Sequence, residues 1–545
     1  MQENMIMIEF NDVTLRESGQ VEGGGMSVED QEGLVDRLMR VGTRRIEIGF
    51  PGSSDEQLKN CIRIRKFVDQ SNCVSDKPLL SGLARGAEID IDAVKKAGCD
   101  ICHIVIPVSD QLVMAQFNSV KYGNTKEGKQ NFLFDLAVKC IKYAKRLGFK
   151  HIEYSPEDAA RASDVDYLCR LIKGVIDAGA TVVNIPDTTG LCIGNEFGDR
   201  IAYIFDNVSN IGKAQVSVHC HNDSDHSTHN ALCAIRNGAT IIEGTFFGLG
   251  ERSGMTKFEA ILLSLFTRRD VFANYAVCLD ASMTVEIVNF VATALGMQVP
   301  RHHVVAGIQN IVVSSGMHQG VEAGAAKQEQ ASPYYSWKPD MFGHTGVEVV
   351  LNQSSSRKGL RYRLEQLGFD VTNEQLDRIY QKMTKLSDAR AGARVTDHEL
   401  ITLAQDVVEK TPFRIEVVRC QAIGGRGTIP NATIIIEAEG KQASASMKGN
   451  GTFHAVMLAV FEAAKDIFPE LKGVEIVLKR WQPVQVGEGA EAIADLHAAI
   501  GLVNEKNRIY SGRDADVDTI QATAQGYANC ISWLVNSLRG NGNSK

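Results

Sequence analysis

Two histidines, His219 and His221, lie two positions apart at the end of the β-rich run "QVSVHC". Residues i and i+2 of a strand share a face, so we expect both imidazoles to point the same way. Such a pair alone is also consistent with two hydrogen-bonded core histidines. Glu17 follows the first β-rich run, and a carboxylate beside two imidazoles would suit a divalent cation such as Mg²⁺, Mn²⁺ or Zn²⁺. With coordination positions left open, that cation would polarise a bound carbonyl group.

Two further polar residues could contact a substrate. Arg16 precedes Glu17 and could make a charge-assisted contact to a carboxylate or to a developing alkoxide. The alternative for Arg16 is a structural salt bridge. Thr188, in "PDTTG", could donate to a substrate carboxylate, and its alternative is a simple turn residue.

The elements that must position these residues alternate along the first 270 residues. Short β-rich runs such as "RRIEIGF", "DICHIVIP" and "TVVNI" are separated by amphipathic helical patterns, for example "SVEDQEGLVDRLMRVG". Eight such strand–helix units predict a (β/α)8 TIM barrel of the α/β class, with a doubly wound open sheet as the alternative. The unusual polar residues follow the carboxyl ends of their strands, where barrel active sites are built, and this agreement favours the barrel.

The rest of the chain changes character twice. After a barrel domain at 1–275, residues 276–411 show helical patterns without intervening strands and predict helical linker subdomains. Residues 412–545 combine strands such as "ATIIIEAEGKQASASM" with two helices and predict an α+β module.

Composition excludes several classes of protein. The net charge of −8 gives no electrostatic footprint for nucleic acid. The acidic start of "MQENMIMIEF" does not match a secretory signal, and no apolar run is long enough to span a membrane. The 12 cysteines are scattered, so reduced thiols are expected. We therefore expect a soluble cytoplasmic protein.

The motifs resemble one enzyme family. "DVTLRESGQ", "EIGFPGSS", "EYSPEDAAR", "NIPDTTG", "HCHND" and "GLGERSG" occur in the order seen in the isopropylmalate synthase, homocitrate synthase and citramalate synthase group. The resemblance continues through "SSGMHQG" and "PYYSWKPDMFG" to a C-terminal module similar to the allosteric domain of isopropylmalate synthases. It implies a metal-dependent barrel acyltransferase that condenses acetyl-CoA with a 2-oxo acid. It also implies at least a homodimer, with an amino-acid effector as a candidate ligand of the module.

The resemblance also assigns roles to individual residues. Glu17, His219 and His221 correspond to the metal ligands, Arg16 to the substrate and oxyanion arginine, and Thr188 to the residue that holds the acceptor carboxylate. Glu157 and His318 correspond to the acid/base pair that enolises the acetyl group, and Tyr334 to an auxiliary tyrosine. His318 and Tyr334 lie outside the barrel, and in such enzymes this histidine reaches the active site of a partner subunit. On its own, His318 would be read as a surface histidine.

The sequence motifs point to two different 2-oxo acid acceptors. The Arg16–Glu17 pair and Met255 resemble homocitrate synthases, whereas "GFPGSS" and the C-terminal module resemble isopropylmalate synthases. A second carboxylate, as in 2-oxoglutarate, would need a cationic partner such as Arg85 or His103, although His103 could equally be a packed strand residue. A branched acceptor needs only an apolar pocket, which the largely apolar strands could form. We expect 2-oxoisovalerate, and thus a role in leucine biosynthesis, ahead of 2-oxoglutarate and pyruvate.

Two other functions remain open at this point. A carbon–carbon lyase or aldolase of the same superfamily would share the barrel, but Glu157, His318 and the C-terminal module belong to the condensing enzymes. A catalytically silent sensor that kept the module is disfavoured because Arg16 and the three ligand residues are intact.

Overall fold

The structure, a computed structural model, describes residues 5–328, 332–408, 414–486, 493–503 and 509–542. It contains two compact units. One consists of Met1–Ile311 with Tyr335–Gly346, and the other of Val312–Tyr334 with Val347–Lys545. Among the described residues, no helix is both long and apolar enough to cross a membrane.

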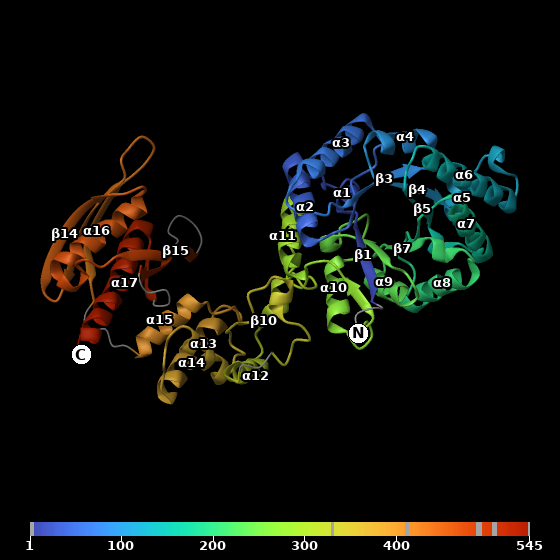
Figure 1. Ribbon diagram of the computed structural model, residues 1–545. Helices are drawn as coiled ribbons and strands as arrows, with labels where there is room; N and C mark the ends of the chain where they lie inside the picture. Colours follow the sequence, from blue (N-terminus) through green and yellow to red (C-terminus); the bar gives the residue numbers. More distant parts are fainter. Residues whose placement is uncertain (1–4, 329–331, 409–413, 487–492, 504–508, 543–545) are drawn as a thin grey trace. The chain divides into compact units, whose positions relative to one another are not determined.

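The first unit is built on a closed parallel barrel (Figure 1). Its strands follow the order β2-β3-β4-β5-β6-β7-β8-β1, and β1 pairs with β2 to close the ring. The expected TIM barrel is therefore confirmed. The strands are β1 (Ile6–Asp12), β2 (Arg45–Glu47), β3 (Leu79–Arg85), β4 (Ile101–Pro107), β5 (His151–Glu157), β6 (Val182–Asp187), β7 (Gln215–Cys220) and β8 (Ile241–Gly244).

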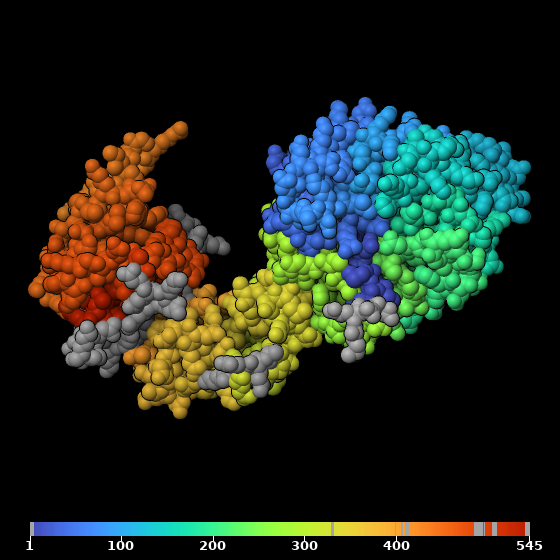
Figure 2. Space-filling model, viewed as in Figure 1, coloured from blue at the N-terminus to red at the C-terminus, as the bar shows by residue number. Residues whose placement is uncertain are grey.

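Amphipathic helices cover the outside of the barrel. In α7, for example, buried Leu168, Ile172 and Val175 recur on one face, and the Asp164 side chain caps the helix by accepting a hydrogen bond from the Tyr167 amide. The helices of this layer are α2 (Val28–Val41), α3 (Asp55–Gln70), α4 (Glu88–Lys96), α5 (Asp110–Gln116), α6 (Lys126–Arg146), α7 (Val165–Ala178), α8 (Gly194–Asn207), α9 (Ser227–Arg236) and α10 (Phe258–Thr267). On the face seen in Figure 2 the helices cover most of the barrel, and the dark blue N-terminal segment reaches the surface. Met5, Ile6 and Met7, at and just before the start of β1, are exposed.

The interior of the barrel is polar. Apolar residues of the strands, such as Ile104 and Ile242, belong to the core shared with the helices, whereas one buried polar side chain from each strand points inward. These eight residues, which we call the polar ring, are Asn11, Glu47, Ser81, His103, Glu153, Asn184, Ser217 and Glu243. Hydrogen bonds between alternate strands, such as Asn184 to Glu243, place them inside the barrel. The expectation of an apolar pocket formed by the strands is met only in part. Most apolar side chains of the strands face the helices, but Leu83 of β3, Val105 of β4 and Pro186 of β6 line a cavity at the strand ends.

After the barrel, the first unit adds β9 (Tyr275–Val277), which pairs with β1, and α11 (Thr284–Ala294). The second unit begins with β10 (Val312–Val313), α12 (Gly316–Lys327), β11 (Glu348–Val349), α13 (Arg357–Gln366), α14 (Asn373–Asp388) and α15 (Asp397–Val408). The prediction of helices without strands across 276–411 is therefore wrong in one respect: β10 and β11 form a short parallel pair. Strands of two residues leave no periodic signal in a sequence.

The C-terminal module has two antiparallel sheets of three strands each. Their members are β12 (Glu416–Ile423), β13 (Asn431–Ala438), β14 (Lys441–Lys448), β15 (Ile476–Val486), β16 (Ile493–Leu502) and β17 (Ile509–Asp516). Helices α16 (Thr452–Ile467) and α17 (Thr519–Gly542) share one apolar core with these sheets. The α+β character is as expected, although β16 and β17 were not identified from the sequence. The domain boundaries at 275 and 411 remain predictions.

Candidate active site

A cavity of about 180 Å³ opens at the carboxyl ends of the barrel strands. Fifteen residues line it, and they include Arg16, Glu17, Glu157, Thr188, His219 and His221. The carboxyl ends of β1, β5, β6 and β7, with the residues that follow them, thus bring six of the eight predicted site residues to one place. The remaining residues of the wall are Gln20, Leu83, His103, Val105, Ser155, Asn184, Pro186, Glu243 and Glu251.

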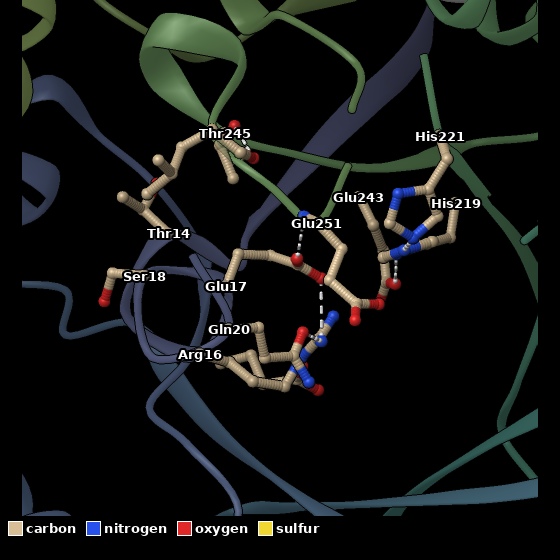
Figure 3. A network of polar contacts seen from close by, with 12 residues as sticks. Thr14, Arg16, Glu17, Ser18, Gln20, His219, His221, Glu243, Thr245 and Glu251 are labelled. Atoms are coloured by element: carbon tan, nitrogen blue, oxygen red, sulfur yellow. Dashed lines mark hydrogen bonds and ion pairs between the residues drawn. The ribbon is translucent and has the colours of Figure 1, made fainter. Parts of the chain in front are cut away.

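Glu17, His219 and His221 converge at this cavity (Figure 3). Glu17 lies on the short helix α1 (Thr14–Ser18), which follows β1 after one residue, while His219 lies near the end of β7 and His221 just beyond it. One potential ligand atom from each of the three residues lies within 4.8 Å of the other two. The two imidazole Nε2 atoms are 3.3 Å apart, as expected for residues that share a strand face.

The protonation states of the three residues suit a metal. Burial away from water, together with nearby positive charge, lowers the pKa of His219 and of His221 to about 4, so both are neutral at pH 7 and keep a free lone pair. For Glu17, burial alone would raise the pKa, but the positive charge of Arg16 holds it below its ordinary value. One carboxylate and two neutral imidazoles form a donor set that fits a divalent cation.

Both histidines are oriented by their second ring nitrogen. His219 Nδ1 lies 2.8 Å from Glu243 Oε2, and His221 Nδ1 lies 3.3 Å from the carbonyl oxygen of Gly254. These contacts turn both Nε2 atoms toward Glu17. Hydrogen bonding of the non-coordinating nitrogen is the usual way in which proteins position metal-binding histidines.

Arg16 lines the cavity and also contacts a buried carboxylate inside the barrel. Its guanidinium pairs with Glu17, Nη1 to Oε1, at 2.7 Å and also with the buried carboxylate of Glu47. Burial opposes the charged form, but these carboxylates outweigh it and keep the pKa of Arg16 above its ordinary value. Arg16 therefore makes the salt bridges of the structural alternative and still lines the cavity as a cation.

Glu157 and Thr188 come from neighbouring strands. Glu157 is the last residue of β5, and burial, followed by the nearby charge of Asp158, raises the pKa of its carboxyl group. A raised pKa suits a residue that exchanges a proton near neutral pH. Thr188 Oγ1 accepts a hydrogen bond from the Asp158 amide at 3.0 Å, so its own hydrogen remains available for another acceptor.

His318 and Tyr334 are not brought to this cavity. Both belong to the second unit, where His318 lies in the first turn of α12 and its ring stacks on Tyr334 with centroids 4.0 Å apart. Both side chains are exposed. Within the second unit the structure thus brings these two residues together.

A second buried group adjoins the cavity, and of its members only His103 was named from the sequence. Glu47, His103 and Glu243 also offer ligand-type atoms within 4.8 Å of one another, but they already bond to neighbours. His103 Nδ1 lies 2.5 Å from Glu47 Oε2 and His103 Nε2 lies 2.7 Å from Ser155 Oγ. Burial alone would lower the pKa of His103, but the charge of Glu47 raises it to about 9. The signal for this group was polar residues at alternate strand positions, as in "RIE" of β2.

Arg85 and Met255, which the sequence motifs singled out, lie in different surroundings. Arg85 is not among the residues that line the cavity; its guanidinium pairs with Asp90 at 2.8 Å and its side chain is 66% exposed. The suggestion that Arg85 could hold a distal carboxylate is therefore wrong. Met255 is fully buried, and its backbone pairs with that of His221, so an apolar residue adjoins the metal-ligand set.

The fold and the site together define a TIM-barrel protein with a metal-ligand set at the carboxyl ends of its strands. The HMGL-like family model matches residues 7–291, the homocitrate synthase post-HMGL domain-like model residues 313–391, and the LeuA allosteric (dimerisation) domain model residues 394–535. The chain belongs to the HMGL-like family and, within it, to the group that contains the 2-isopropylmalate synthases.

Relatives that match nearly the whole chain support its assignment to the group that contains the 2-isopropylmalate synthases. A 2-isopropylmalate synthase of Pelotomaculum thermopropionicum is 30% identical, over 96% of this chain and 97% of that protein. The enzymes named 2-isopropylmalate synthase from Pyrococcus furiosus and Geobacillus sp. are 30% and 31% identical, over 97% and 98% of this chain and 99% and 97% of theirs. The family resemblance drawn from the motifs is thus confirmed, and with it membership in a family of transferases.

Proposed function

We propose that this chain catalyses the Claisen condensation of acetyl-CoA with a 2-oxo acid, releasing free coenzyme A. The observation that carries the proposal is the convergence of Glu17, His219 and His221 with Arg16 and Glu157 on one cavity. A divalent cation held by the three ligand residues would polarise the keto group of the acceptor as a Lewis acid. The protein's own residues then have to hold the acceptor, move one proton and stabilise an alkoxide.

Each of these tasks has a candidate. Thr188 would donate a hydrogen bond to the acceptor carboxylate, and the guanidinium of Arg16 would stabilise the alkoxide that forms from the keto oxygen. Glu157, whose pKa is raised by burial, would act with His318 on the α-proton of the acetyl group, with Tyr334 in support. Hydrolysis of the resulting thioester would release the thiol of coenzyme A.

A second subunit would complete this site. His318 and Tyr334 belong to the second unit of the chain, and the match of the LeuA allosteric (dimerisation) domain to residues 394–535 supports a homodimer. We therefore propose that His318 serves the barrel of the partner subunit. The same domain is the proposed site for a small effector such as an amino acid.

For the acceptor we propose 2-oxoisovalerate, which would place the enzyme in leucine biosynthesis. Leu83, Val105 and Pro186 line the cavity and provide an apolar contact for a branched side chain. His103 is the candidate partner for the second carboxylate of an acceptor such as 2-oxoglutarate. Both of its ring nitrogens, however, are already hydrogen-bonded, to Glu47 and to Ser155. A dicarboxylate would have to break one of these buried bonds. The 2-isopropylmalate synthase relatives support the same choice.

The favoured alternative is homocitrate synthase activity with 2-oxoglutarate, because His103 lines the cavity and its raised pKa keeps it charged at neutral pH. Release of free thiol from acetyl-CoA, measured with 2-oxoisovalerate, 2-oxoglutarate and pyruvate, tests both proposals. We expect the highest kcat/KM with 2-oxoisovalerate. A clear preference for 2-oxoglutarate would overturn the acceptor assignment, and no thiol release with any 2-oxo acid would overturn the reaction.

A further inference from the structure

A buried carboxylate stands directly behind one of the proposed metal ligands. Glu243 lies on β8 and is the register partner of His219 on β7. Partners in adjacent strands present their side chains on the same face of the sheet, and here His219 Nδ1 lies 2.8 Å from Glu243 Oε2 (Figure 3). Glu243 is fully buried and lines the same cavity as His219.

Two asparagines hold the carboxylate of Glu243 in place. Asn11 on β1 donates from Nδ2 to Oε1 at 2.8 Å. Asn184 on β6 donates from Nδ2 to Oε2 at 3.1 Å and also to Ser155 Oγ at 2.9 Å. Donors from β1, β6 and β7 thus meet on one carboxylate, which fixes both its position and its rotation.

This arrangement decides which nitrogen of His219 carries hydrogen. A carboxylate only accepts hydrogen bonds, and each of its oxygens can accept more than one. Oε2 of Glu243 can therefore accept from His219 Nδ1–H as well as from Asn184. A neutral imidazole that is protonated on Nδ1 keeps its lone pair on Nε2, the atom that lies 3.3 Å from His221 Nε2. The ring is therefore held in the tautomer and the orientation that metal binding requires.

We propose that Glu243 is a positioning residue for the metal site, which acts through His219 and is itself held by Asn11 and Asn184. The inference rests on the proposed metal-ligand set of Glu17, His219 and His221. It adds a function for one member of the polar ring. Glu243 orients the ligand His219 from behind.

The test compares two buried glutamates of the same ring. In Glu243→Gln the amide keeps the shape of the side chain, but its NH₂ group must face one of the three donors. Glu153→Gln is the matched control, because Glu153 is equally buried and neither of its carboxylate oxygens has a hydrogen-bond partner among the described residues. Asn11→Ala is a milder variant that keeps the carboxylate and removes one of its two amide supports.

Metal affinity is measured on the full-length, chelator-treated protein with Mn²⁺ as the probe, by the electron paramagnetic resonance signal of free Mn²⁺. We expect Glu243→Gln to bind Mn²⁺ about 10- to 100-fold more weakly than the unsubstituted protein, the usual effect of losing the partner of a metal-binding histidine. Asn11→Ala should bind with a smaller loss, and Glu153→Gln with none. The absorption spectrum of the Co²⁺-loaded protein should change in Glu243→Gln alone, because it reports ligand geometry rather than stability.

These measurements need no substrate, so they separate this inference from the proposed reaction. Equal Mn²⁺ affinity and an unchanged Co²⁺ spectrum in Glu243→Gln would overturn the positioning role even if thiol release occurs. Failure of the unsubstituted protein to bind Mn²⁺, Co²⁺ or Zn²⁺ would overturn the ligand set and this inference together. If Glu243→Gln does not fold, unchanged affinity in folded Asn11→Ala counts against the role.

Discussion

Replacing the buried Glu47 by glutamine should strongly destabilise the barrel. Glu47 is fully buried and accepts from two cations, the guanidinium of Arg16 and the ring of His103, the latter at 2.5 Å. Glu47→Gln keeps the shape of the side chain but removes its charge. Arg16 and His103 would then share a buried space without their common counter-ion.

The size of the effect follows from the pKa of Glu47. Burial alone would raise this pKa, but Arg16 and His103 lower it from its ordinary value of 4.5 to about 2. Each tenfold change in an equilibrium corresponds to about 1.4 kcal/mol, so the ion pairs stabilise the fold by on the order of 3 kcal/mol. Because the pKa is lowered on folding, this contribution is complete above about pH 4.5 and is lost as the pH falls toward 2. It is therefore fully present at pH 7, and removing one partner of a buried ion pair usually costs about 3–5 kcal/mol.

Urea unfolding at pH 7 measures this loss. Trp337 packs against the barrel core, whereas the other two tryptophans belong to the C-terminal module, so a Trp481→Phe/Trp533→Phe background reports on the barrel unit alone. Asp270→Asn is the control, because Asp270 pairs with Arg268 at 2.8 Å and both side chains are more than half exposed. It should leave the midpoint unchanged. A loss of less than about 1 kcal/mol in Glu47→Gln would refute the reasoning, since it would mean that water or a neighbouring group compensates the two cations.

Three further predictions concern the proposed reaction. His221→Ala should abolish metal retention and turnover while the circular dichroism spectrum stays unchanged, and full activity in this chelator-treated variant would reject the ligand set. Glu157→Gln should lower kcat by about a hundredfold or more with little change in the KM of the acceptor; a raised KM with intact kcat would instead make Glu157 a binding residue. Mixing inactive Glu157→Gln with inactive His318→Ala should restore part of the activity through hybrid dimers, whereas no recovery after verified subunit exchange would mean that each chain completes its own site.

The barrel and its upper rim could be predicted because their signals are local. Polar residues with no role in an apolar core follow most of the β-rich runs, and eight strand–helix units predict a ring whose strand ends meet. The pair His219–His221 shows its shared face by spacing alone. Glu17 could be joined to it because β1 and β8 must be neighbours in any closed barrel.

The interior of the barrel could not be predicted in the same way. Glu47 and Glu243 each stand between apolar neighbours, in "RIE" and "IIEG", a pattern that usually indicates one buried and one solvent-exposed face. In this barrel the strand face that carries the polar residues points into the barrel, so these polar side chains are buried. The partners of these residues come from distant strands, and no sequence spacing reveals them. The proposed role of His318 is not local either, because it would depend on the assembly of two chains.

The hydrogen bond between Asn11 and Glu243 joins residues that are 232 positions apart. At a synthesis rate of about 5–20 residues per second, a ribosome needs on the order of ten to fifty seconds to make the second partner after the first. Throughout that interval the strands already made carry charged groups, Glu47 among them, on the side that will become the inside of the barrel. A half-made barrel would bury these charges without their partners, so nascent chains should remain open and dependent on water, or on a chaperone, until β8 leaves the ribosome.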